Sequence, residues 1–140
     1  MGDLFGALGI SASGMAAERL RMDVTAGNLA NADSTRGADG LPYQRREVVL
    51  AAGGPGFADA LGAAQAGVHV EAIVADPSPG RKVYDPGHPD ADAEGYVTLP
   101  NVSTVVEMTD LIAESRSYEA DTQALDTAKQ LYLKTLDVLR

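Results

Sequence analysis

The sequence predicts a mainly α fold with a small β insert, in which long N- and C-terminal helices pack as a coiled coil and flank a middle region of short β-strands. Apolar residues recur every seven positions at each end of the 140-residue chain. Such a repeat keeps one helix face apolar and favours a supercoiled partner helix. Pro and Gly clustered between the repeats exclude long helices from the middle. We therefore divide the chain into an N-terminal helix (residues 1–35), a β-rich middle region (36–101) and a C-terminal helix (102–140).

The N-terminal helix is predicted from about residue 4 to residue 31. Its main apolar stripe consists of Leu8, Met15, Met22 and Leu29. A second stripe lies roughly 200° around the helix, at 100° per residue. It consists of Ile10, Ala17 and Val24. Two stripes predict a helix with neighbours on more than one side. Gly14 and Gly27 each lower the helix propensity by about 1 kcal/mol relative to Ala, so we expect this helix to depend on packing.

The middle region predicts short strands rather than helices. Residues 43–50 and 68–74 favour strands, the second because apolar and polar side chains alternate along it. A short strand is predicted over 81–84, and residues 95–99 are positioned to close a small sheet. Residues 51–67 are rich in Ala and Gly, and we expect them to form a mobile loop.

The C-terminal helix is predicted after Pro100, over residues 102–140. Its stripe consists of Leu111, Tyr118, Leu125, Tyr132 and Leu139. Asn101 or Ser103 is positioned to cap it, and the run from Thr104 to Glu107 fits a capping box. Acidic residues dominate the first half and basic residues the second, as the helix dipole favours.

The charge distribution excludes two classes of partner. The net charge is −9, with two bases and four acids in residues 1–35, five and nine in 36–101, and four and seven in 102–140. Nucleic acids and anionic membrane surfaces require clustered Lys and Arg, so we expect no nucleic-acid partner. No apolar run approaches the roughly 20 residues that span a bilayer, and we expect no direct membrane insertion.

The chain contains no cysteine, which excludes disulfides, thiolate zinc sites and cysteine nucleophiles. The start of the sequence lacks the features of a secretory signal, because the first base is Arg19 and the apolar run Leu4–Ile10 is interrupted by two glycines. We therefore expect any export to proceed without a cleaved signal peptide.

No motif predicts an enzyme or a cofactor site. Gly9–Ser13 approaches the G-x-S-x-G elbow, but it ends in Ser and its context is helical. Asp90–Glu94 begins like a calcium loop, but the twelfth position is Asn101 instead of Glu, so we interpret it as a solvated acidic turn and expect no metal. His69 and His88 lack a companion motif and are interpreted as ordinary strand and turn residues. A small hydrolase that uses His88 remains an alternative.

Four stretches carry a family resemblance. Ile10-Ser11-Ala12-Ser13-Gly14-Met15, followed by Asn28-Leu29-Ala30-Asn31-Ala32, resembles the N-terminal signature of the flagellar axial proteins of the rod and hook family. The block around Asp85-Pro86-Gly87-His88-Pro89, with Arg116-Ser117-Tyr118-Glu119-Ala120, is similar to the proximal-rod members of that family. The resemblance covers nearly the whole chain except residues 51–67. Asp121 departs from it, because the family usually has Asn there; Asp loses the amide donor and adds charge.

The resemblance implies a structural subunit of the bacterial flagellar basal-body rod, not an enzyme, that polymerises helically with other rod proteins into a drive shaft in the periplasmic space. It implies export, largely unfolded, through the flagellar type III apparatus. The implied partners are further copies of the chain, the MS-ring or export-gate adaptor, distal rod neighbours and the export apparatus. We expect inter-subunit packing at Leu8, Met15, Met22, Leu29, Asn28, Asn31, Leu111, Tyr118, Leu125, Tyr132 and Leu139. A different axial subunit, or a soluble coiled-coil adaptor unrelated to flagella, is the alternative.

Overall fold

The computed structural model describes residues 2–37, 40–52 and 67–138. The elements are, in chain order, α1 (Gly2–Ala30), β1 (Arg46–Ala52), β2 (Val68–Ala75), β3 (Arg81–Tyr84), β4 (Tyr96–Leu99) and α2 (Thr104–Val138). The chain has two long helices, with a small β region between them in the sequence, and this confirms the predicted mainly α class. The predicted mobile loop lies, over residues 53–66, outside the described residues.

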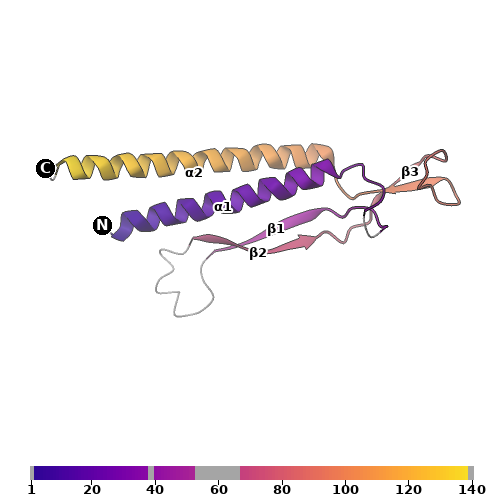
Figure 1. The fold of residues 1–140 in the computed structure, drawn as a ribbon, viewed down its shortest axis with the longest axis horizontal. Helices are drawn as coiled ribbons and strands as arrows, with labels where there is room; N and C mark the ends of the chain where they lie inside the picture. Colours follow the sequence, from indigo (N-terminus) through magenta and orange to yellow (C-terminus); the bar gives the residue numbers. More distant parts are fainter. Residues whose placement is uncertain (1, 38–39, 53–66, 139–140) are drawn as a thin grey trace.

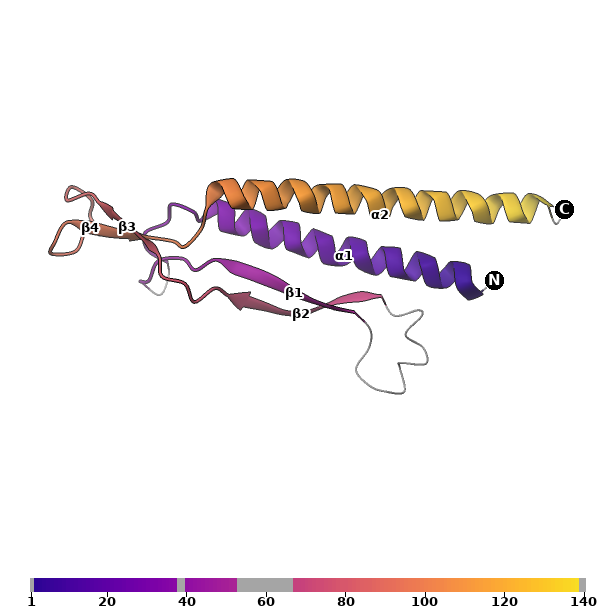
Figure 2. The same ribbon diagram turned by 180° about the vertical axis from the view of Figure 1, so that it is seen from behind.

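The two helices run antiparallel, side by side (Figure 1). Asn28, near the end of α1, contacts Glu107, near the start of α2. Gly14, half-way along α1, lies against Asp121, half-way along α2. The start of α1 and the end of α2 therefore lie at the same end of the molecule, and the β3–β4 hairpin extends from the opposite end (Figure 2).

Helix α1 forms the middle of three layers, with α2 on one side and the β1–β2 hairpin on the other (Figures 1 and 2). On the hairpin side, the Ser13 hydroxyl accepts a hydrogen bond from the Val68 backbone N–H at 3.0 Å. Ala17, from the second apolar stripe, is buried. The two stripes thus predicted the packing on two sides correctly.

The strands form two separate antiparallel pairs, β1–β2 and β3–β4. The prediction that residues 95–99 close one small sheet with the preceding strands is therefore wrong, because β4 pairs with β3 alone. In the first pair, Arg46 faces Ala75 and Ala52 faces Val68, with one register shift between Val49 and Leu50.

Strand β1 begins at Arg46, three residues later than expected. The reason is that the preceding backbone and side chains bond outside the hairpin. The Arg45 N–H donates to the Asn101 side chain at 2.8 Å, and the Tyr43 hydroxyl donates to the Asn28 side chain at 3.0 Å. Local β propensity therefore gives way to tertiary hydrogen bonds at this point.

The apolar core of the described residues is thin. Its buried apolar residues are Ala17, Ala32 and Val97. Many large apolar side chains stay exposed on the strands and on α2, where they are Val105, Val106, Met108, Ile112, Leu131, Leu133 and Leu136. Neither described helix combines the length and the apolar character needed to cross a membrane.

A polar junction and an exposed apolar face as the candidate assembly site

Asn28 forms the centre of a polar junction where α1, β1 and α2 meet. Its side-chain oxygen accepts hydrogen bonds from the Arg46 backbone N–H at 2.9 Å and from the Tyr43 hydroxyl at 3.0 Å. Its amide nitrogen donates to the Arg46 carbonyl and to the Glu107 carboxylate, both at 2.9 Å. All four hydrogen-bonding positions of the amide are therefore occupied. The side chain is 1% exposed and joins the end of α1 to the first residue of β1.

Glu107 is the buried acid of the same junction, with 1% of its surface exposed. One carboxylate oxygen accepts from the Asn28 amide, and the other accepts from Arg45 Nε at 2.6 Å. The Arg45 guanidinium also pairs with Glu47 and, at 3.5 Å, with Asp110. The predicted capping box is thus wrong, because the Glu107 carboxylate bonds to other elements instead of its own helix start. A buried charge that is paired and hydrogen-bonded in this way tolerates burial.

Asn101 closes the junction from the side of α2. Its oxygen accepts from the Arg45 N–H, and its amide donates to the Asp76 carbonyl at 3.1 Å. The Asp76 N–H donates in turn to the Arg45 carbonyl at 2.8 Å. Asn101 was expected as a possible helix cap, but it links the start of β1 to the end of β2.

Glu114 lies one heptad after Glu107, in the same interface between the helices. Its Oε1 accepts from the Thr25 hydroxyl at 3.1 Å and lies 3.6 Å from Arg21 Nε. Its Oε2 is buried and has no hydrogen-bond partner among the residues that the structure describes. Burial raises the pKa of this carboxyl above its usual range, against the opposing effects of Thr25 and Arg21.

Asp121 continues the series, so acids face α1 from positions 107, 114 and 121. Its Oδ2 would lie 2.8 Å from a Cβ atom placed on Gly14, which shows how closely the carboxyl approaches α1. The sequence analysis missed this carboxylate row, although its spacing is the same seven residues as the apolar stripe. The sequence analysis interpreted the acids separately, as partners of the helix dipole, as part of a capping box at Glu107 and as a departure from the family at Asp121. The departure at Asp121 thus falls in an interface within one chain.

The predicted stripe residues lie beside this row. On α2 the stripe residues Leu111, Tyr118 and Leu125 follow Glu107, Glu114 and Asp121 by four positions. This spacing places each of them on the helix face that meets α1. The half-buried members are Leu8, Met15, Met22, Leu29, Leu111, Tyr118, Leu125 and Tyr132. The Thr122 hydroxyl reaches Met15 Sδ at 3.5 Å, which connects α2 to a stripe residue of α1. Asn31 donates to the Gly27 carbonyl at 2.8 Å and closes the end of α1. Leu139 lies outside the described residues.

The opposite face of α2 presents apolar side chains that no described element covers. Near its start, Val105 is 73% exposed, and Met108 and Ile112 are each 54% exposed. Their spacing of three and four residues places them on one face. Near the other end, Leu133 and Leu136 are also exposed, but Leu136 follows Tyr132 by four positions and therefore lies on the stripe face. Exposed apolar patches on a thin core are typical of proteins that complete their packing with other chains.

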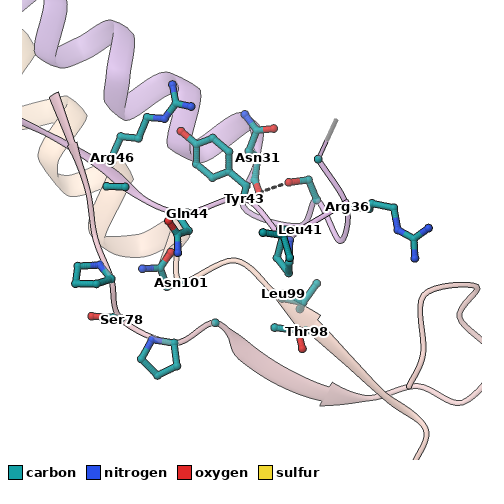
Figure 3. A pocket seen from close by; sticks show the side chains of 17 residues that line it. Asn31, Arg36, Leu41, Tyr43, Gln44, Arg46, Ser78, Thr98, Leu99 and Asn101 are labelled. Atoms are coloured by element: carbon teal, nitrogen blue, oxygen red, sulfur yellow. Dashed lines mark hydrogen bonds between the residues drawn. The ribbon is translucent and has the colours of Figure 1, made fainter. Parts of the chain in front are cut away.

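A cleft of about 720 Å³ separates the segment after α1 from the link between β2 and β3. Figure 3 shows Tyr43 and Arg46 on one side of it and Leu99 on the other. Among its described lining residues, none is Asp, Glu or His, so they offer no carboxylate or imidazole for acid–base chemistry. The cleft marks the joint between the helical part and the β3–β4 hairpin.

The acidic turn does more than stay solvated, contrary to the sequence interpretation. Asp90 accepts from the Thr35 hydroxyl at 2.7 Å and pairs with Arg36 at 2.8 Å, so it ties the β3–β4 hairpin to the segment after α1. Asp92 Oδ1 accepts from the backbone N–H groups of Tyr96 and Glu94. The Tyr96 bond is the main reason why the pKa of Asp92 falls below its usual range. Asp90 therefore joins two segments of the chain, and Asp92 stabilises the turn before β4.

The two histidines lie on different elements, His69 on β2 and His88 in the turn between β3 and β4. His69 is exposed on β2, and His88 Nδ1 accepts from the Asp90 N–H at 3.1 Å within its own turn. Within residues 2–37, 40–52 and 67–138, no group of three His, Asp or Glu side chains converges to hold a metal ion.

Family comparisons agree with this geometry. The family described as "Flagella basal body rod protein" matches residues 8–38, which include most of α1 and the Asn28 junction. The family described as "Flagellar basal body rod FlgEFG protein C-terminal" matches residues 93–138, which include β4 and α2. The two long helices and the junction between them therefore belong to the class of flagellar rod proteins.

Whole-chain relatives narrow the class. The chain is 46% identical over 127 residues to a protein of Yersinia enterocolitica named flagellar basal-body rod protein FlgC, with 91% of each chain covered. It is 43% identical over 145 residues to the Bacillus subtilis protein of that name, with 96% of this chain and 97% of the relative covered. The Borreliella burgdorferi protein is 39% identical over 150 residues, with 98% of each covered. The chain belongs to the FlgC family. It is a structural rod protein of the flagellar basal body and not an enzyme.

Proposed function

We propose that this chain polymerises helically, with further copies and with other rod proteins, to form the proximal part of the flagellar drive shaft in the periplasmic space. The observation that carries the proposal is the exposed apolar face of α2, in a chain whose own apolar core is thin. A subunit that leaves such a face uncovered gains free energy when a neighbour excludes water from it, at about 25 cal/mol per Å².

The coiled-coil prediction belongs to the same proposal. The residues of α2 that face α1 recur every seven positions, at 107, 114 and 121, and the apolar stripe follows each by four. This is the spacing of the two core positions of a heptad. We propose that α1 and α2 wind around each other as the inner pair of the assembled rod, although polar side chains occupy one core position in each heptad.

The predicted inter-subunit residues enter the proposal with different roles. The half-buried stripe residues, such as Met22 and Leu125, keep part of their surface free for a neighbour. Asn28 acts indirectly, because its amide is fully used within the chain. Asn31 closes α1 at the same end.

The remaining partners follow from the place of a proximal subunit. We propose contacts with the MS-ring or export-gate adaptor at one end, with distal rod proteins at the other, and with the type III export apparatus during delivery. A thin core suits delivery, because a chain with little internal packing unfolds at a low free-energy cost.

The experiment places a charge on the exposed face. Ile112→Asp should leave the free chain folded, because Ile112 is 54% exposed, but should prevent its recovery in purified basal bodies and abolish swimming. The matched control is Ala124→Asp, which adds the same charge at an exposed position of the same helix, roughly 120° around the helix from Ile112 at 100° per residue. Normal swimming in the Ile112→Asp strain would contradict the assignment of this face.

A further inference from the structure

A second cleft, of about 260 Å³, lies between α1, α2 and β1. Its walls are mostly polar. The charged residues that line it are Arg21, Arg45, Arg46, Glu47, Asp110 and Glu114. It differs in this respect from the larger cleft at the β3–β4 hairpin, whose described lining residues include no acid.

Glu114 is the unusual member of this lining. The residue is 4% exposed, and its Oε2 has no hydrogen-bond partner within the described part of the chain. Buried carboxylate oxygens are normally satisfied, and an orphaned one costs about 1–3 kcal/mol or more. Arg21, the nearest cation, already bonds Glu18 at 3.1 Å and lies beside the other oxygen, Oε1.

The charge around this oxygen is negative. Three arginines contribute to the cleft, and Glu47, Asp110 and Glu114 balance them. Two more acids adjoin, because Glu18 pairs with Arg21 and Glu107 pairs with Arg45. Five acids against three bases leave an excess of two negative charges. Charge complementarity therefore favours a cation over an anion or a neutral group.

We propose that this cleft receives a cationic side chain, Lys or Arg, from a neighbouring subunit of the rod, which completes the hydrogen bonding of Glu114. The proposal rests on the proposed function, since the donor comes from the polymer. It explains why a buried acid with an orphaned oxygen lies in the helix interface instead of a Leu or an Ala. The contact couples assembly to the packing of α1 on α2, because Glu114 would bond the neighbouring subunit through Oε2 while it bonds Thr25 of α1 through Oε1.

In the free chain, burial without a bound cation favours the protonated form of Glu114. Burial raises the folded-state pKa of Glu114, which Glu18 and Asp110 support and Thr25 and Arg21 oppose. An acid whose pKa is raised on folding stabilises the fold below the unfolded pKa, about 4.3, and this stability is lost as the pH rises through the folded pKa. Glu114→Gln imitates the protonated form, so the melting temperature of the free variant should lose this component of pH dependence and exceed that of the wild type at pH 7.

The same substitution should weaken assembly, because it removes the charge that the neighbour binds. Incorporation of Glu114→Gln into basal bodies should fall about tenfold or more, the change expected for loss of one charge-assisted hydrogen bond. The control is Asp23→Asn, which removes an exposed acid from α1 outside the cleft lining and should incorporate normally. Equal incorporation of Glu114→Gln and wild type would overturn the proposal.

A stiffer helix pair could also impair assembly, and a second variant separates the two causes. Ala17→Gly lowers the stability of α1 at a buried position that is not part of the cleft lining. If the Glu114→Gln defect persists in the double variant, the missing charge is its cause. If Ala17→Gly restores assembly, the proposal is wrong. Absence of the wild-type chain from purified basal bodies would instead contradict the proposed function itself.

Discussion

Asn28 shows how one polar side chain can determine the route of the chain. It bonds both the N–H and the C=O of Arg46, as a neighbouring strand would, and so positions the first residue of β1 against the end of α1. The same amide reaches Glu107, 79 residues later in the sequence. A buried network of this kind is stabilising only when every member is satisfied, and at Asn28 every position is filled.

Asn28→Ala should therefore destabilise the free chain by about 3 kcal/mol, because it leaves the Arg46 N–H and one Glu107 oxygen buried without this partner. Chemical denaturation followed by circular dichroism measures the change. Asn31→Ala is the matched control, since it removes one hydrogen bond to a helix carbonyl and should cost about 1 kcal/mol. If both variants lost the same free energy of unfolding, the Asn28 junction would contribute no more than an ordinary hydrogen bond, contrary to this prediction.

The polar contacts between α1 and α2 decrease along the helix pair, away from the Asn28 junction. Near the junction, Glu107 is fully bonded and the first residues of β1 add further partners. Further along α2, Glu114 lacks one hydrogen-bond partner among the described residues, and half-way along α2 the contact is the Asp121 carboxyl against the backbone of Gly14. The two helices should therefore separate first at the end where α1 begins and α2 finishes.

Hydrogen exchange on the free chain tests this gradient. Amides of residues 22–30 and 107–115 should exchange more slowly than those of residues 8–14 and 121–130, because local opening requires fewer contacts to break at the far end. Mass spectrometry of peptides from these four segments provides the rates, with the denatured chain as the reference. Uniform protection along both helices would contradict the gradient.

The molecule as a whole has an inner and an outer face on α2, and substitutions on them should have different effects. Leu125 is half-buried beside Asp121, whereas Ile112 is exposed. Leu125→Asp should lower the free energy of unfolding of the free chain by about 1–3 kcal/mol, and with it the melting temperature. It should also prevent motility. Ile112→Asp should prevent motility alone.

Thermal unfolding of purified chains and swarm assays of complemented strains measure these two effects separately. Ala124→Asp, which adds the same charge at the exposed position beside Leu125, is the control and should change neither property. A Leu125→Asp strain that swims normally would be incompatible with the α1–α2 interface as part of the rod.

Local patterns predicted which segments become helices and strands. The stripes at positions 8 to 29 and 111 to 132 match α1 and α2, and the alternation over 68–74 matches β2. These elements are readable because hydrophobic periodicity is a property of consecutive residues. The two stripes of α1 even predicted neighbours on two sides, without showing which neighbour lies on which side.

The polar contacts were decided by the tertiary structure alone. Thr25 meets Glu114 across 89 residues, and Asp90 meets Thr35 across 55. Nothing local distinguishes Glu107 at a helix cap from Glu107 in a buried junction, because a hydrogen bond depends on where two distant backbones place their side chains. The sequence by itself therefore determined the helices, most of the strands and the family, while the separate hairpins, the filled junction at Asn28 and the orphaned oxygen of Glu114 arose only when the layers packed.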